Sequence, residues 1–163
     1  MIRKKKRYSR PKKAFEKSRI DEENRLLKKY ALKNKLEVWK TIAKVNYFRR
    51  RAMALARSSF EEQDILFSKL RALGLNATST ADALALKIED LLERRLPTIV
   101  FKKGLAKTPQ EARQMVAHKR VLIEKKVIDS PSYLVSLSEE NNIEIKRKAK
   151  PAKYHSYQGE ATR

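Results

Sequence analysis

The chain has 163 residues with 40 Lys and Arg against 19 Asp and Glu, which leaves a formal net charge of +21. This length supports one domain or two small ones, and a hydrophobic content of 41% is too high for a fully disordered chain. Because the chain has no cysteine, disulfides, thiolate metal sites and cysteine nucleophiles are excluded.

No apolar run approaches the roughly 20 residues that span a bilayer. The basic N-terminus is not followed by an apolar stretch, so it does not resemble a secretory signal. We therefore expect a location inside the cell and no membrane partner.

Charge is distributed unevenly along the chain. Residues 1–20 hold 10 basic residues and 1 acidic one, and residues 147–163 hold 5 and 1, whereas residues 21–93 hold 14 and 11. We predict a basic disordered arm over residues 1–13 and a basic tail over residues 147–163, on either side of a folded body. A charge this large repels itself unless an anionic partner neutralises it. Nucleic acid is the first candidate, and an acidic membrane surface is the second.

Residues 14–93 are predicted to be helical. Residues 14–30 favour a weakly apolar helix. Asn34 and Glu37 have the spacing of a capping box, which indicates the start of a second helix with Trp39 on its core face.

Two further helices are expected before residue 94. Ser59 and Glu62 repeat the capping-box spacing, and the leucine stripe that follows ends at Gly74, a residue suited to a helix C-terminus. Beyond a polar stretch, apolar residues recur with the period of a single amphipathic helix from Ala81 to Leu92.

Three consecutive arginines, Arg49, Arg50 and Arg51, lie in the second predicted helix. Because successive helical residues are about 100° apart, these side chains fan across the helix surface and cannot all face a core. Such runs are often only solvated charge. Few acidic residues lie opposite them here, so we interpret them as contacts to an RNA phosphate backbone.

Residues 94–146 change character and predict a compact α+β unit. A short helix over residues 94–103 would carry Pro97 in its first turn and end at Gly104. The segment Thr108-Pro109-Gln110-Glu111 then combines a cap, a proline at the first helical position and a glutamate at the third, which indicates a strong helix start.

Short strands are expected after this helix, and they would form a small, mostly antiparallel sheet. Tyr133 fits a core residue and a base-stacking residue equally well. The expected strands are Val121–Ile123, Val127–Ile128, Tyr133–Val135 and Ile143–Ile145.

Several separate segments, in order, resemble one known family. Residues 94–135 contain RRLPTIVFKKGLAKTPQEARQMVAHKRV and then SPSYLV. This pattern resembles the RNA-binding domain named after small-subunit ribosomal protein four. Upstream, KKYALKNKLEVWK, RRRAMALA and ALKIEDLLERRLPTIVFKKGLA resemble the N-terminal region and domain junction of the archaeal and eukaryotic form of that protein. The resemblance covers about residues 5–146.

The resemblance implies a structural protein of the small ribosomal subunit that binds ribosomal RNA. It would bind a multi-helix junction of the 5′ domain, near the mRNA entrance, and nucleate assembly. The resemblance also implies contacts with neighbouring small-subunit ribosomal proteins, a monomer within the ribosome, and a cytoplasmic location. We expect no cofactor and no metal, because the chain has no cysteine and only two histidines.

The resemblance also implies which residues face RNA. His118 could instead be a helix-end histidine that only its own backbone satisfies. The matching positions are Arg94, Arg95, Arg113, Gln114, His118 and Lys119, and the basic residues Lys102, Lys103, Arg120, Lys125 and Lys126 complete the candidate set.

The chain departs from the family pattern at two turns and one helix. His118-Lys119-Arg120 and Glu124-Lys125-Lys126 stand where the family usually has His-Gly and Asn-Gly turns, and Pro97 stands where proline is unusual. The cysteine zinc ligands of some relatives are absent.

Two other classes of function fit less well. An enzyme would need a phosphate loop, a metal motif or a pair of acid–base groups, and the sequence shows none of them. RNA-modifying enzymes that carry this RNA-binding domain, such as pseudouridine synthases, need a separate catalytic domain. A free-standing RNA chaperone would be a bare module with a short tail, whereas here a long helical region precedes the module.

Overall fold

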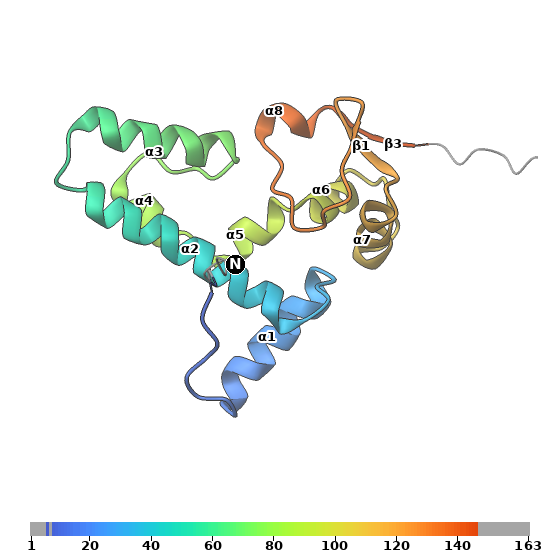
Figure 1. Ribbon diagram of the computed structural model, residues 1–163, viewed down its shortest axis with the longest axis horizontal. Coiled ribbons are helices and arrows are strands. Elements are labelled where there is room, and N and C mark those ends of the chain that lie inside the picture. Colours follow the sequence, from blue (N-terminus) through green and yellow to red (C-terminus); the bar gives the residue numbers. More distant parts are fainter. Residues whose placement is uncertain (1–5, 7, 147–163) are drawn as a thin grey trace, which may run out of the picture.

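The computed structural model describes residue 6 and residues 8–146. The described chain has the α+β fold that the sequence predicts, with helices first and a small sheet near its end (Figure 1). The predicted tail and residues 1–5 and 7 of the predicted arm lie outside the described residues. The elements are α1 (Lys17–Lys29), α2 (Lys35–Leu55), α3 (Phe60–Ala72), α4 (Thr80–Ala85), α5 (Ile88–Glu93), α6 (Leu96–Lys102), α7 (Pro109–Ala117), β1 (Val121–Ile123), β2 (Lys126–Val127), α8 (Leu137–Glu140) and β3 (Ile143–Ile145).

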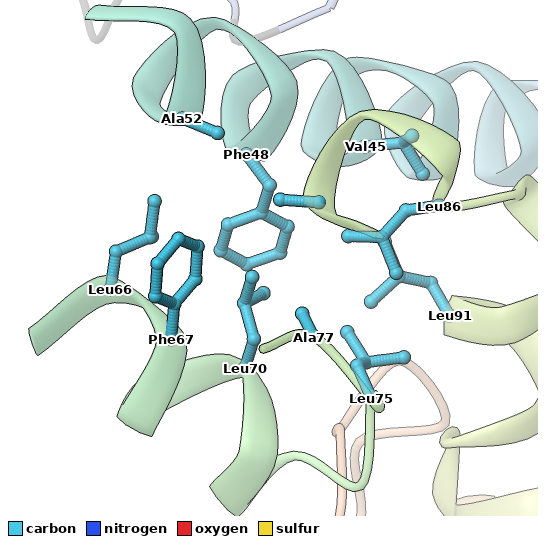
Figure 2. Close-up of a cluster of buried hydrophobic side chains, with 11 residues drawn as sticks. Val45, Phe48, Ala52, Leu66, Phe67, Leu70, Leu75, Ala77, Leu86 and Leu91 are labelled. Carbon is cyan, nitrogen blue, oxygen red and sulfur yellow. The ribbon is translucent and has the colours of Figure 1, made fainter. Parts of the chain in front are cut away.

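The first hydrophobic core lies between α2 and α3, with residues of α4 and α5 completing it (Figure 2). The two long helices contribute large side chains at helical spacing, and burying them is the main stabilisation of this half. Gly74 ends α3 with φ +75, a conformation that glycine adopts without strain. The buried members are Val45, Phe48, Ala52, Leu66, Phe67, Leu70, Leu75, Ala77, Ala83, Leu86 and Leu91.

Residues 80–93 form two short helices, so the prediction of one helix from residue 81 to residue 92 is wrong. The backbone is extended at Leu86, whose side chain is buried in the first core. Arg49 Nη2 donates to Leu86 O at 2.6 Å, and Lys87 N donates to Asp90 Oδ2 at 2.7 Å where α5 begins. These hydrogen bonds stabilise the break between α4 and α5. The apolar pattern of residues 81–92 runs through this break without interruption, so the sequence does not reveal it.

The second core lies where α6 and α7 pack against the sheet. The strand order is β2-β1-β3, and both pairings are antiparallel, as the sequence predicts. Because β1 is central, both of its flanking strands shield it from solvent. The buried members are Leu96, Ile99, Val100, Ala106, Ala112, Met115, Val116, Val121, Ile123, Val135 and Ile143.

The segment Tyr133–Val135 is not a strand of this sheet, so that prediction is also wrong. It forms one isolated bridge, between Leu134 and Arg95. Leu96 N donates to Tyr133 O at 2.9 Å, and Val135 N donates to Arg94 O at 3.0 Å. The β-like residues therefore pair with the backbone just before α6, because that segment is free to offer its amide and carbonyl groups.

At two turns where the family usually has glycine, this chain has other residues in the left-handed conformation. The β1–β2 hairpin has a two-residue turn, Glu124-Lys125, with φ +49 and +66. Lys119, with φ +58, ends α7, where its amide donates to Val116 O and the next amide donates to Met115 O. The backbone geometry of a glycine turn is thus kept, and side chains occupy positions where glycine carries no steric strain.

The predicted caps at Asn34 and Thr108 form, whereas Ser59 makes no side-chain cap. Asn34 Oδ1 accepts from Glu37 N at 3.3 Å, and Thr108 Oγ1 accepts from Glu111 N at 3.1 Å. In a complete capping box the Glu37 carboxylate would reach back to the backbone amide of Asn34. Instead it binds Arg95 and Arg113. These arginines belong to residues 94–146, which we call the second half of the molecule, and Glu37 belongs to the helical first half, residues 14–93.

Candidate nucleic-acid interface

Helix α7 is a rigid platform at the edge of the second half (Figure 1). Its cap at Thr108 and the proline after it define its start, and Ala112, Met115 and Val116 anchor one face in the core. Gln114 is consequently exposed on the outer face. A side chain presented from such an anchored helix keeps a defined position, which is the condition for recognising a shape.

Arg113, on the same helix, is turned toward the first half of the chain. Its Nη2 lies 2.5 Å from Glu37 Oε1 and its Nη1 lies 3.1 Å from Glu37 Oε2, a bidentate pair. Arg95 Nη2 reaches Glu37 Oε2 at 2.8 Å, and Arg95 Nε donates to Pro131 O at 3.2 Å. One carboxylate of α2 therefore holds two arginines of the second half.

The electrostatics of this cluster favour the charged carboxylate. Burial alone would raise the pKa of Glu37, but hydrogen bonds and charge from Arg113 and Arg95 outweigh burial and hold that pKa below its ordinary value. Arg95 is only 5% exposed. Without Glu37 its guanidinium would be a buried charge with no counterion.

Arg94 also binds inside the molecule. Its Nη2 donates to Val135 O at 3.1 Å, and its Nη1 lies 2.8 Å from Glu140 Oε2. The guanidinium packs over Gly74, where an added Cβ would meet Arg94 Cζ at 3.0 Å. Arg94 thereby joins the end of α3 to α8.

The arginines Arg94, Arg95 and Arg113 therefore join the two halves of the chain. Sequence reasoning missed this use, because it treated Glu37 only as a capping residue. The three-residue spacing from Asn34 to Glu37 correctly indicates a helix cap. The arginines that bind the Glu37 side chain lie 58 and 76 residues away in the sequence, so no local pattern reveals them. Contacts from the three arginines to RNA stay a prediction.

A second group of candidates is exposed near the end of α7 and on the β1–β2 hairpin. Lys119 lies 3.9 Å from Asp129, and both side chains are well exposed to solvent. Arg120 is half-buried, and its Nε has no hydrogen-bond partner among the described residues. The exposed members of this group, which we call the α7–hairpin surface, are Gln114, His118, Lys119, Lys125 and Lys126.

The α6 lysines face in another direction. Lys102 Nζ lies 2.8 Å from Glu93 Oε2 of α5, and Lys103 Nζ donates to Glu140 O of α8. Both side chains are exposed. The structure thus does not bring these two candidates together with the α7–hairpin surface, and a part in RNA binding stays a prediction for them.

The three arginines of α2 point in different directions, as their spacing predicts. Arg49 is half-buried through its bond to Leu86 O, whereas Arg50 and Arg51 are exposed. Arg50 Nε donates only to Asn46 O of its own helix, at 3.3 Å. Two of the three positive charges are therefore available to an anion.

The two aromatic candidates, Tyr133 and Trp39, both make hydrogen bonds inside the protein. Tyr133 packs against the second core and its hydroxyl donates to Glu139 Oε1 at 2.7 Å, which is chiefly what raises the pKa of Tyr133 to about 12. Trp39 is half-buried, and its indole N–H donates to Glu23 Oε1 of α1 at 2.9 Å. Both side chains stabilise the fold.

Metal-ligand clusters and membrane-spanning helices are both absent from the part of the chain that the structure describes. Among residues 6 and 8–146, no three His, Cys, Asp or Glu side chains gather as metal ligands would. In the same residues, no helix combines the length and apolarity needed to cross a membrane.

Comparisons with known proteins find one family model and several relatives. The S4 domain family model matches residues 94–141. Proteins named small ribosomal subunit protein uS4 are similar over most of the chain. The one from Methanothermobacter thermautotrophicus is 43% identical over 85% of this chain and 84% of its own length. Those from Picrophilus torridus and Methanosphaerula palustris are 42% and 40% identical, over 85% and 83% of this chain and 80% and 81% of their own lengths.

Proposed function

The chain belongs to the family of small ribosomal subunit protein uS4, and from that premise we propose that it is a structural, RNA-binding component of the small ribosomal subunit. Its relatives are named for a subunit of the ribosome and its second half matches an S4 domain. The same premise supports a cytoplasmic location in that subunit, neighbouring ribosomal proteins as partners, and no catalytic activity of its own.

The α7–hairpin surface is the proposed centre of ribosomal RNA recognition. The observation that carries this proposal is the anchored α7 helix, which presents Gln114, His118 and Lys119 beside the lysines of a tight hairpin. Lysines on fixed backbone bind phosphates in one arrangement, so they select a shape rather than a base sequence. A junction of several RNA helices in the 5′ domain, near the mRNA entrance, offers such a shape.

The inward arginines would act on recognition indirectly. Arg95 and Arg113 fix the angle between α2 and α7 through Glu37. Because exposed cations of α2, such as Arg50 and Arg51, lie on one side of this joint, RNA that contacts both halves would sense that angle. A free-standing chaperone would use only the second half, but the similarity to uS4 proteins extends over both.

Charge reversal on the α7–hairpin surface tests this proposal. Lys126→Glu combined with Gln114→Glu should weaken binding to small-subunit ribosomal RNA, and Lys126→Glu alone should reduce the slope of log affinity against log salt by about 1. The matched control is Arg57→Glu, at an exposed residue in the turn between α2 and α3. Equal losses from the control and surface variants would show that only total charge matters, and would refute the assignment.

A further inference from the structure

A concave surface follows part of α2, and Phe48 of the first core contributes to its lining. It is a groove of about 1040 Å³ between α2, the segment before α1 and the loop after β2. The segment that precedes α1 lies next to α2 at this point (Figure 1). This volume is at the upper end of what small-molecule pockets enclose. Its lining residues are Tyr8, Lys40, Ala43, Lys44, Tyr47, Phe48, Arg50 and Ser132.

The groove carries positive charge that no described carboxylate pairs with. Lys40, Lys44 and Arg50 line it, and among the described residues none of them has a carboxylate within 4.0 Å. Burial lowers the pKa of Lys44, as expected for an ammonium group that lacks a counterion. Three cations that line one groove therefore favour an anionic occupant.

An aromatic ring stands among these cations in a fixed position. Tyr47 is 53% exposed, and its ring packs edge-on against Phe48, which is 9% exposed and belongs to the first core. The two ring centroids are 5.7 Å apart. Tyr8 closes the other side, with Lys40 Nζ 6.0 Å from its ring centroid. An exposed ring supported by a core ring is a preformed platform for stacking.

We propose that this α2 groove binds an unpaired stretch of RNA, with one base stacked on Tyr47 and its flanking phosphates on Lys40, Lys44 and Arg50. The inference rests on the proposed RNA-binding function and adds a second, single-stranded contact to it. In an A-form duplex each base face is covered by the next base, so only a splayed base reaches the ring. Cations alternating with aromatic rings are the pattern that binds single strands without sequence preference.

Two probes separate stacking from charge. The full chain is titrated with a short oligouridylate and with an abasic strand of the same length, at one salt concentration. Tyr47→Ala should weaken oligouridylate binding by roughly 5- to 150-fold, the range expected for loss of one base–aromatic stack, and leave the abasic strand unchanged. Tyr47→Phe should retain binding. Phe60→Ala, at another exposed aromatic residue, is the matched control and should change neither affinity.

Three outcomes would overturn the inference. Tyr47→Ala could leave oligouridylate binding intact, or it could weaken both strands equally. An oligoglutamate peptide could also bind as tightly as the strand and lose as much affinity on Tyr47→Ala, which would assign the groove to an acidic protein segment. If Tyr47→Ala is silent while Lys126→Glu still weakens ribosomal RNA binding, only the groove inference fails. If neither change has an effect, the proposed function fails as well.

Discussion

Removing the Glu37 carboxylate should destabilise the whole chain, because that group is the counterion for two arginines. Breaking a buried ion pair by removing one partner costs about 3–5 kcal/mol. Water reaches part of this cluster, since the side chains of Glu37 and Arg113 are 17% and 22% exposed. We therefore expect about 3 kcal/mol for Glu37→Ala, at the low end of that range.

Thermal unfolding provides the assay. A change of 1 kcal/mol shifts Tm by about 2–4 °C in a protein of this size, so Glu37→Ala should lower Tm by roughly 6–12 °C. Glu89→Ala is the matched control, because the Glu89–Lys29 pair is about half exposed and solvent screens it, so its loss should lower Tm much less. A Tm for Glu37→Ala within the shift caused by Glu89→Ala would refute the reasoning.

The same carboxylate predicts a pH dependence with a definite sign. The folded pKa of Glu37 lies below its ordinary value of 4.5. Its contribution is therefore fully present above that ordinary value and is lost as pH falls through the lower folded pKa. The stability difference between the wild type and Glu37→Gln should shrink on acidification below about pH 4.5. A difference that stays constant down to the acid transition would contradict this assignment.

Further predictions concern the turns and the salt dependence. The double change Glu124→Asn and Lys125→Gly should stabilise the protein by about 1 kcal/mol in denaturant unfolding, because both positions have positive φ. It should also remove the proposed phosphate contact of Lys125. Gly104→Ala should cost about 1–2 kcal/mol from backbone strain alone, and Gly74→Ala should cost more, because the Arg94 guanidinium must also move. Equal unfolding free energies for the two alanine variants would show that this close approach does not matter. If about six to ten phosphates are contacted, affinity for ribosomal RNA should fall roughly 10³- to 10⁵-fold between 50 and 200 mM salt, and a nearly flat profile would exclude the electrostatic account.

Local patterns in the sequence were sufficient for much of the fold. The caps at Asn34 and Thr108 and the end of α3 at Gly74 follow from interactions within a few residues, and the strands Val121–Ile123 and Ile143–Ile145 are indicated by their own apolar residues. Such signals are read correctly because the groups that decide them are close in the chain. The fanning of Arg49–Arg51 is likewise a matter of helical geometry.

Only the tertiary structure decided where the chain breaks and which cations turn inward. A distant arginine that binds Leu86 O favours the break between α4 and α5, and pairing with the backbone before α6 keeps Tyr133–Val135 out of the sheet. The same holds for the candidate site. The resemblance implies that Arg113 faces RNA, and in the structure Glu37 of α2 binds its guanidinium. Composition established that the protein needs an anionic partner. Which positive charges stay exposed to that partner depends on contacts between residues far apart in sequence, because those contacts bury some guanidinium groups and leave others in solvent.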